Sequence, residues 1–274
     1  MAKKRQKKRT QNYKKHLGQI PGALVYTGSK EDKILHLYAF DYSEDSFKEA
    51  DLNTVEEAFN FKDSETVTWF NLNGLNFIDQ IEKIGQHYKL HPLILEDIVN
   101  TSQRPKIDEY KDYFFIVLKM MYYDADEKLV SEQVSIVMGK NYVLTFQEAE
   151  GDVFDSLRDR IRQKKGRVRE EGSDYLMYAL IDAIVDHYYA IIETMGNKIE
   201  DLEDDLFTGM TQEQISQQIQ NLKREILKLR RAIFPLREII NRVEKSDNPL
   251  IEEKTTHYFM DVYDHIIQVT ENID

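Results

Sequence analysis

The side chains in this sequence that could do chemistry are mainly carboxylates. The chain has no cysteine, so disulfides and thiolate metal sites are excluded, as in proteins of a reducing compartment. It contains no glycine-rich phosphate loop, no Gly-x-Ser-x-Gly and no His-Glu-x-x-His. His257 and His265 lie eight residues apart, which we interpret as coincidence rather than as a zinc site. The remaining candidates, all carboxylates that suit hard divalent cations, are Glu96, Asp97, Asp182, Asp186, Asp201, Glu203, Asp204, Asp205, Asp261 and Asp264.

Asp182 is the most informative of these residues. It lies among apolar neighbours in YLMYALIDAIVDHYYAII, where a charge is costly unless it is paired or bound to a metal. Asp186 follows one helical turn later, on the same face. Solvation or pairing with Arg or Lys would also explain these acids, and Glu203 to Asp205 read as a solvated helix end.

The charge is unevenly distributed along the 274 residues. Residues 1–18 hold eight Lys or Arg and no acid, whereas the whole chain has a net charge of −12, so the remainder carries −20. Such an acidic body collects cations and does not favour nucleic acid. The basic tail could contact anionic lipid, nucleic acid or a targeting receptor, or it could be a solvated, disordered terminus, which is what we expect.

No secretory signal and no membrane span is predicted, because no apolar run approaches about 18 residues. Apolar residues make up 41% of the chain, enough for a substantial core. Up to about residue 150, hydrophobic periodicity and turn signals predict mixed strands and helices, with helices packed on a sheet. The expected strands are 22–26, 33–40, 66–72, 113–123, 130–138 and 142–146, and the expected helices are 75–88 and a short one from His91-Pro92.

From about Asp152 the chain reads as almost entirely helical. We expect helices over 152–163, 174–207, 212–245 (capped by Thr211) and from Glu252 onward. The third helix has a heptad rhythm, and Pro235 inside it predicts a kink or a local break. The last helix stops at Asp274 without a stop signal, which suggests that the natural protein continues. The apolar seam of the third helix comprises Ile215, Ile219, Leu222, Ile226, Leu229, Ile233, Leu236, Ile240 and Val243.

Several segments, in order over about residues 20–274, resemble the CorA family of magnesium transporters. The longest is HPLILEDIVNTSQRPKIDEYKDYFFIVLKM at 91–120. The others are SEQVSIVMGKNYVLTFQE (131–148), GDVFDSLRDRIR (151–162), LIDAIVDHYYAIIE (180–193), LKREILKLRRAIFPLREII (222–240) and YFMDVYDHIIQ (258–268).

The resemblance implies an α+β fold in which an α/β/α sandwich forms the wall of a cytoplasmic funnel. Residues 1–18 would be the tail, 19–170 the sandwich, 171–247 a long antiparallel helical hairpin and 250–274 the start of a stalk helix. It also implies a homopentamer in the inner or plasma membrane, with this segment in the cytoplasm. The two membrane spans and the Gly-Met-Asn selectivity motif would follow, and neither occurs in this sequence.

The resemblance further implies regulatory Mg²⁺ sites between neighbouring subunits. Asp97 would face Asp261 across the boundary, and a second site would use Glu96, Asp182 and the same Asp261. Occupied sites would hold the closed state of a channel for Mg²⁺, and Co²⁺ or other divalent cations would also bind. The protein would then not be an enzyme.

Three other interpretations remain open from the sequence. The first is a zinc transporter of the same superfamily, since the residues that choose the ion would lie in the pore. The second is a soluble coiled-coil scaffold whose basic tail binds nucleic acid or membrane. The third is a carboxylate-metal hydrolase, which lacks support because no general base or nucleophile accompanies the acids.

Overall fold

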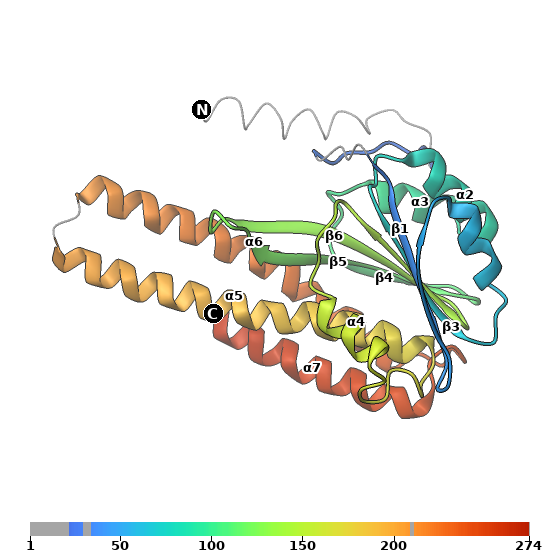
Figure 1. Cartoon of the computed structure of the whole chain (residues 1–274). Helices are drawn as coiled ribbons and strands as arrows, with labels where there is room; N and C mark the ends of the chain where they lie inside the picture. Colours follow the sequence, from blue (N-terminus) through green and yellow to red (C-terminus); the bar gives the residue numbers. More distant parts are fainter. Residues whose placement is uncertain (1–21, 30–33, 209–210, 274) are drawn as a thin grey trace.

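The computed structural model describes residues 22–29, 34–208 and 211–273 (Figure 1). The predicted basic tail, residues 1–18, lies outside the described residues. A seven-stranded sheet has the strand order β2-β1-β3-β7-β6-β5-β4, with β3 and β7 parallel and every other neighbouring pair antiparallel. The strands are β1 (His36–Tyr42), β2 (Phe47–Leu52), β3 (Val67–Asn73), β4 (Lys106–Glu109), β5 (Phe114–Tyr123), β6 (Leu129–Met138) and β7 (Tyr142–Gln147).

Helices cover both faces of this sheet, so the predicted α/β/α sandwich is confirmed (Figure 1). Strand β5 is almost entirely apolar because both of its faces are buried: Phe114 and Ile116 belong to one core, and Phe115 and Val117 to the other. One face carries η1 (Val55–Phe61, a 3-10 helix), α2 (Ile78–Tyr88) and α3 (Pro92–Val99). The other face carries α4 (Asp155–Arg162), α5 (Ser173–Thr208), α6 (Gln212–Glu244) and α7 (Glu253–Ile273).

Three strand predictions were wrong or incomplete. Residues 22–26 form no strand, and their backbone meets α3 instead, where Gly22 N–H donates to the Glu96 carboxylate over 2.7 Å. The edge strands β2 and β4 were missed. Both are short, and β2 (FKEADL) has only half-buried and exposed residues, so it carries too few apolar positions for the period-two pattern to show.

Helix α6 runs without interruption through Pro235, so the predicted local break is absent. Proline has no N–H to donate to the carbonyl one turn earlier, but tertiary packing offsets that loss. The flanking Ile233 and Leu236 are fully buried against the other helices. The start of α6 matches the prediction, because Thr211 and Gln214 form a reciprocal capping box.

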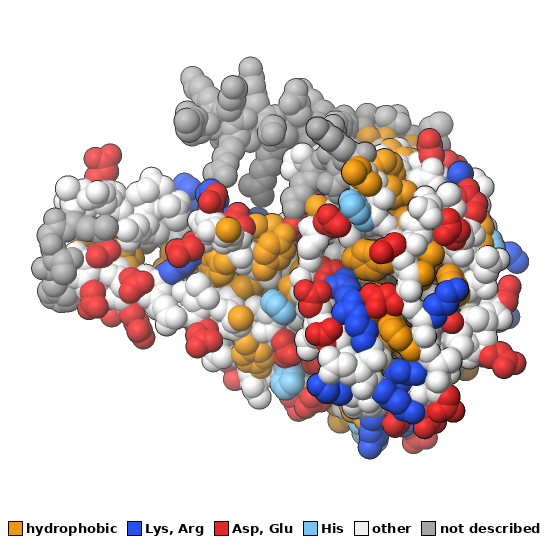
Figure 2. Space-filling view, viewed as in Figure 1, with side chains coloured by type: hydrophobic (Ala, Val, Ile, Leu, Met, Phe, Trp, Pro, Cys, Tyr) orange, Lys and Arg blue, Asp and Glu red, His pale blue; other side chains and the backbone are white. Residues whose placement is uncertain are grey.

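The outer parts of α5 and α6 form a hairpin that extends beyond the sheet (Figure 1). The apolar seam of α6 is buried only from Leu229 onward, and Ile219 is 50% exposed. Acidic side chains including Asp201, Glu203 and Asp204 are exposed near the outer end of the hairpin, and Figure 2 shows acidic groups gathered there.

Within the described residues, one helix segment, Ser173–Leu206 of α5, is long and apolar enough to cross a membrane by length and composition. It was not predicted as a span because its apolar residues are interrupted by acids. In the fold, 56% of its most apolar stretch is buried, as in the core helix of a globular domain. We therefore interpret α5 as the central helix of the second core.

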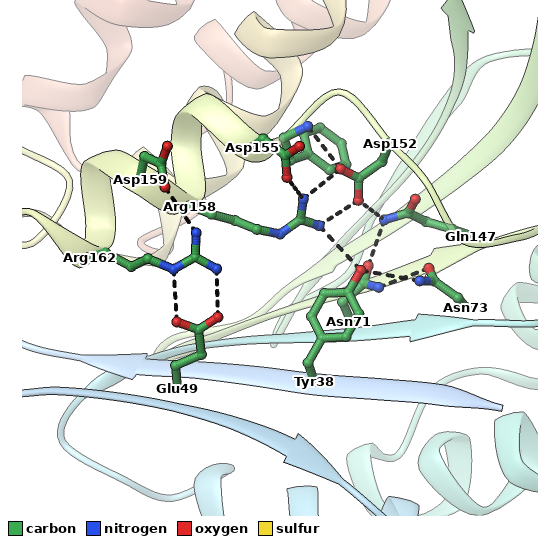
Figure 3. Close-up of polar contacts among 11 residues, drawn as sticks. Tyr38, Glu49, Asn71, Asn73, Gln147, Asp152, Asp155, Arg158, Asp159 and Arg162 are labelled. Carbon is green, nitrogen blue, oxygen red and sulfur yellow. Dashed lines mark hydrogen bonds and ion pairs between the residues drawn. The ribbon is translucent and has the colours of Figure 1, made fainter. Parts of the chain in front are cut away.

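A buried ion pair fastens α4 to the sheet (Figure 3). The Arg158 guanidinium donates to both carboxylate oxygens of Asp152, over 2.7 and 2.5 Å. Their side chains are only 9% and 2% exposed. Asp152 also accepts from Gln147 of β7, and the Arg158 guanidinium lies over the Trp69 ring. Arg158 also pairs with Asp155 at 2.9 Å, but Asp155 is 90% exposed, so Asp152 is the desolvated partner whose loss costs most.

We predict that Asp152→Ala lowers the free energy of unfolding by about 3–5 kcal/mol, measured by urea denaturation, because it removes the buried bidentate partner of Arg158 and leaves only Asp155, which is 90% exposed, to pair with it. Asp126→Ala is the control, since the Asp126–Lys128 pair is 74% and 71% exposed. That substitution should change stability by less than about 1 kcal/mol. Equal losses in the two variants would contradict the assignment of Arg158 to a desolvated pair.

Candidate metal centre

Glu96 and Asp97 are presented by the short helix α3. Pro92 occupies the first turn, and the ring of His91 accepts a hydrogen bond from Leu93 N–H, so the helix starts where the sequence predicts. Ile94 and Ile98 bury the opposite side of the helix. This packing leaves the two carboxylates at the margin of the fold, with Glu96 accepting from Gly22 N–H.

Asp97 already has positively charged and polar partners within its own chain. Its carboxylate pairs with the Lys106 ammonium at 2.6 Å and accepts from the side-chain amide of Gln103. Lys106 also pairs with Asp108 at 2.6 Å. The Asp97 side chain is only 13% exposed, and this burial raises the pKa of Asp97, although Lys106 opposes the effect. A cation that binds Asp97 must therefore compete with Lys106.

A second acidic group lies between α5 and α7. Each of Asp182, Asp186 and His265 offers one possible ligand atom, and these three atoms lie within 4.8 Å of one another. Asp182 and Asp186 are one turn apart on α5, and His265 comes from the packed helix α7. Asp261 is one turn before His265, with its Oδ2 atom 3.9 Å from His265 Nε2. Its side chain is 62% exposed.

Asp182 is the electrostatically strained member of this group. Burial, and then the negative charge of Asp186, raise its pKa to about 6. Asp261 raises the pKa further, whereas His265 and Arg160 lower it by attraction through space. A carboxylate in this environment holds its proton up to about pH 6 and, once ionised, favours a nearby cation.

The four residues predicted as metal ligands thus form two separate groups in one chain. Asp182 and Asp261 share a surface on the α5 and α7 side of the sheet, whereas Glu96 and Asp97 lie on α3, which packs on the other face. Among the described residues, Lys106 and His265 are further members that the sequence analysis did not predict. Asp261 and His265 are four residues apart on one helix, and this spacing could have identified His265 as a neighbour of the predicted ligand Asp261.

We predict that Asp182→Asn increases stability at pH 7 by roughly 1–2 kcal/mol, allowing for partial solvent exposure. Since the folded-state pKa is above the unfolded value, the folded state binds the proton more tightly. The contribution of Asp182 to stability therefore falls as pH rises from about 4 to about 6.

The measurement is urea denaturation of both proteins in chelator-containing buffer between pH 4 and 8. The difference in unfolding free energy between variant and parent should grow as the pH rises from 4 to about 6. The charges of Asp186, Asp261, His265 and Arg160 also act on Asp182. A constant difference across the interval would show that Asp182 does not carry the raised pKa.

Comparisons with known proteins identify the family. The model of the family described as "CorA-like Mg2+ transporter protein" matches residues 64–274. The cobalt/magnesium transport protein CorA of Thermotoga maritima is 43% identical over 259 residues, which cover 94% of this chain and 73% of that protein. The putative metal ion transporter YfjQ of Bacillus subtilis is 28% identical, covering 68% of this chain and 57% of the relative.

Solved structures share the fold at low sequence identity. The soluble domain of CorA from Methanocaldococcus jannaschii has a TM-score of 0.69 at 19% identity, covering 86% of this chain and 90% of that one. The ZntB cytoplasmic domain from Vibrio parahaemolyticus has a TM-score of 0.64 at 12% identity, covering 87% and 91%. This family consists of ion transporters rather than enzymes, which removes the hydrolase interpretation. The chain belongs to the CorA family of magnesium transporters.

Proposed function

We propose that this chain is the cytoplasmic Mg²⁺-sensing part of a homopentameric CorA-type channel that takes up Mg²⁺ and Co²⁺ across the cell or inner membrane. The observation that carries the proposal is the division of the acidic residues into two groups on opposite faces of one sheet. One chain cannot bring Asp97 to Asp261. Two neighbouring copies can, if the α3 face of one meets the α7 face of the next.

Most of the side chains in the two acidic groups suit a hard divalent cation. Glu96, Asp97, Asp182 and Asp261 supply oxygen ligands, and Mg²⁺ needs only one or two carboxylates because it keeps several waters. The raised pKa of Asp182 and the exposure of Asp261 fit a site that a cation completes. The Lys106–Asp97 pair fits less well, and it predicts weak rather than tight binding.

Repulsion between the carboxylates of neighbouring copies gives the site its effect on assembly. Two carboxylates about 4 Å apart across a boundary repel by roughly 4 kcal/mol at an effective dielectric constant of 20. A bound divalent cation supplies positive charge that reverses this repulsion. Without it, the acidic bodies, which carry −20 outside the tail, push one another apart.

This repulsion couples the sites to a gate by linkage. Sites that are completed only in the closed, symmetric assembly stabilise that assembly by their differential affinity for the ion. Five subunits with one or two weak sites each can together supply the ~5.5 kcal/mol that a full switch requires. When the carboxylates are left uncompensated, the closed assembly loses this stabilisation and the open state gains population.

A zinc transporter of the same superfamily is the second candidate, because the Vibrio ZntB cytoplasmic domain has a similar fold. Measuring Mg²⁺ and Zn²⁺ flux through the full-length protein would separate them.

We predict that Asp97→Ala and Asp261→Ala each reduce the Mg²⁺-dependent rise in melting temperature and the Mg²⁺-dependent self-association of the purified chain. Each substitution removes one side of the proposed inter-subunit site, so the ligand contribution to stability falls. Thermal melts and analytical ultracentrifugation, with and without MgCl₂, provide the measurement.

Asp264→Ala is the matched control, because Asp264 is also exposed on α7 and carries the same charge. This variant should retain the response to Mg²⁺. The site assignment fails if Asp97→Ala and Asp261→Ala both keep the full response.

We also predict that Lys106→Met strengthens Mg²⁺ binding by roughly threefold to tenfold, because it frees Asp97 from a competing ammonium group. Isothermal titration with MgCl₂ measures the change. Lys83→Met is the control, since Lys83 pairs with Glu56 at 2.8 Å on an exposed surface and makes no ion pair with Asp97. Unchanged or weaker binding in Lys106→Met would show that Asp97 takes no part in holding the ion.

A further inference from the structure

We propose that a basic cleft at one end of the sheet binds a phosphate chain, such as that of inorganic triphosphate or a nucleoside triphosphate. The cleft has a volume of about 1480 Å³ and lies between the carboxyl end of α2, the β4–β5 and β6–β7 turns, and the loop that joins α6 to α7. This end of the molecule is opposite to the tip of the α5–α6 hairpin (Figure 1). None of the four proposed metal ligands lines the cleft, so the proposal goes beyond the proposed function.

The cleft reverses the charge balance of the chain. Acidic side chains outnumber basic ones by 49 to 37 in the whole sequence, whereas the lining of the cleft holds six basic and four acidic side chains. The basic ones are Lys62, Lys89, Lys111, Lys140, Arg242 and Lys245, and the acidic ones are Asp63, Glu109, Asp112 and Asp247. Cations gathered in a concave site raise the local concentration of small anions.

Most of these cations lack a compensating partner. In the described part of the chain, four exposed lysines of the cleft make neither an ion pair nor a hydrogen bond through their side chains: Lys89, Lys111, Lys140 and Lys245. Arg242 donates to the Ile107 carbonyl over 2.9 Å, and Lys62 donates to the His87 carbonyl over 2.7 Å. A carbonyl group satisfies a donor but leaves its positive charge available to an anion.

The walls of the cleft are tied together by hydrogen bonds between distant segments. The side-chain amide of Asn141, in the β6–β7 turn, donates to the Ser64 carbonyl over 2.6 Å. The side-chain amide of Asn248, in the loop before α7, donates to the Tyr110 carbonyl over 2.9 Å. A cleft whose backbone is already fixed loses less conformational entropy when a ligand binds.

The composition of the cleft favours phosphate groups over other parts of a ligand. Lysine binds phosphate as a point charge with three donors, and several lysines together favour an anion that carries several charges. The aromatic residues of the cleft, Tyr88, Tyr113 and Tyr142, are 3%, 6% and 7% exposed. They leave almost no ring surface on which a nucleotide base could stack, so we expect the phosphate chain to carry the affinity.

A simpler explanation applies to some of these cations. Lys89 caps the carboxyl end of α2, and Arg242 and Lys245 lie at the carboxyl end of α6, where positive charge offsets the helix dipole. Lys111 and Lys140 lie instead in the turns between β4 and β5 and between β6 and β7. No helix end accounts for their charge, so the test depends on these two residues.

The test is isothermal titration of the purified 274-residue chain with sodium triphosphate, ATP and orthophosphate, at constant ionic strength and without Mg²⁺. Triphosphate and ATP should bind with similar affinity, and orthophosphate should bind roughly tenfold more weakly because it reaches fewer lysines. The double variant Lys111→Gln/Lys140→Gln should weaken triphosphate binding roughly tenfold. Both residues are exposed, so this variant is expected to fold.

Lys7→Gln/Lys8→Gln is the matched control, because it removes the same charge from the basic tail. It should leave triphosphate binding unchanged. Equal weakening in the two double variants, or unchanged binding in Lys111→Gln/Lys140→Gln, would overturn the proposal. So would equal affinities for orthophosphate and triphosphate.

The outcome is separable from that of the proposed function, because the titrations contain no Mg²⁺. Lys111→Gln/Lys140→Gln should keep the full Mg²⁺-dependent rise in melting temperature. A parent chain that binds no triphosphate would overturn the basic cleft alone, and it would leave the Mg²⁺ response of Asp97→Ala and Asp261→Ala as the separate test of the inter-subunit site.

Discussion

The compensation of buried carboxylates is the constraint on which this molecule depends. Asp152 meets it with Arg158, and Asp97 meets it with Lys106, each within a single chain. Asp182 does not, because Arg160 and His265 act on it only through space while Asp186 and Asp261 oppose them. A partly buried carboxylate whose charge is not compensated favours a cation beside it, so Asp182 marks where a cation would bind.

The sheet is what keeps the acidic groups apart. Its central strands are buried on both faces, so the helices that carry acids lie on two sides with the sheet between them. Within one subunit the two groups therefore act independently. Any coupling between them must pass through contact between copies, which makes metal binding and assembly a single equilibrium in the proposed function.

Much of this arrangement could be predicted from the sequence. The apolar run from Phe114 to Tyr123 and the hairpin at Gly139 are strong local signals, and so is the capping box at Thr211. The edge strand β2 has no such signal, because its stability comes from pairing with β1 rather than from its own burial. The continuity of α6 through Pro235 was missed for a similar reason, since tertiary burial of the neighbouring residues overrides the local penalty.

The candidate site was predictable only in part. Sequence showed that Asp182 sits among apolar residues, and the resemblance to a family supplied the other three acids. It could not show that Lys106 folds back onto Asp97, or that His265 comes to lie beside Asp182 and Asp186, because each contact depends on how distant elements pack. The same limit applied to the network around Arg158, which joins α4 to residues on β1 and β7.

The length of α5 has a mechanical consequence. Its first turn is pinned, since Ser173 donates to the carbonyls of Gly139 and Lys140 and Asp174 accepts from Glu252 N–H. At a rise of 1.5 Å per residue, Asp182 lies about 14 Å from this pivot and Thr208 about 52 Å from it. Beyond this first turn Val185, Tyr188 and Ile191 are also buried, so the helix is held against the sheet and α7 well past Asp182, and bending of its outer part is amplified at the far tip.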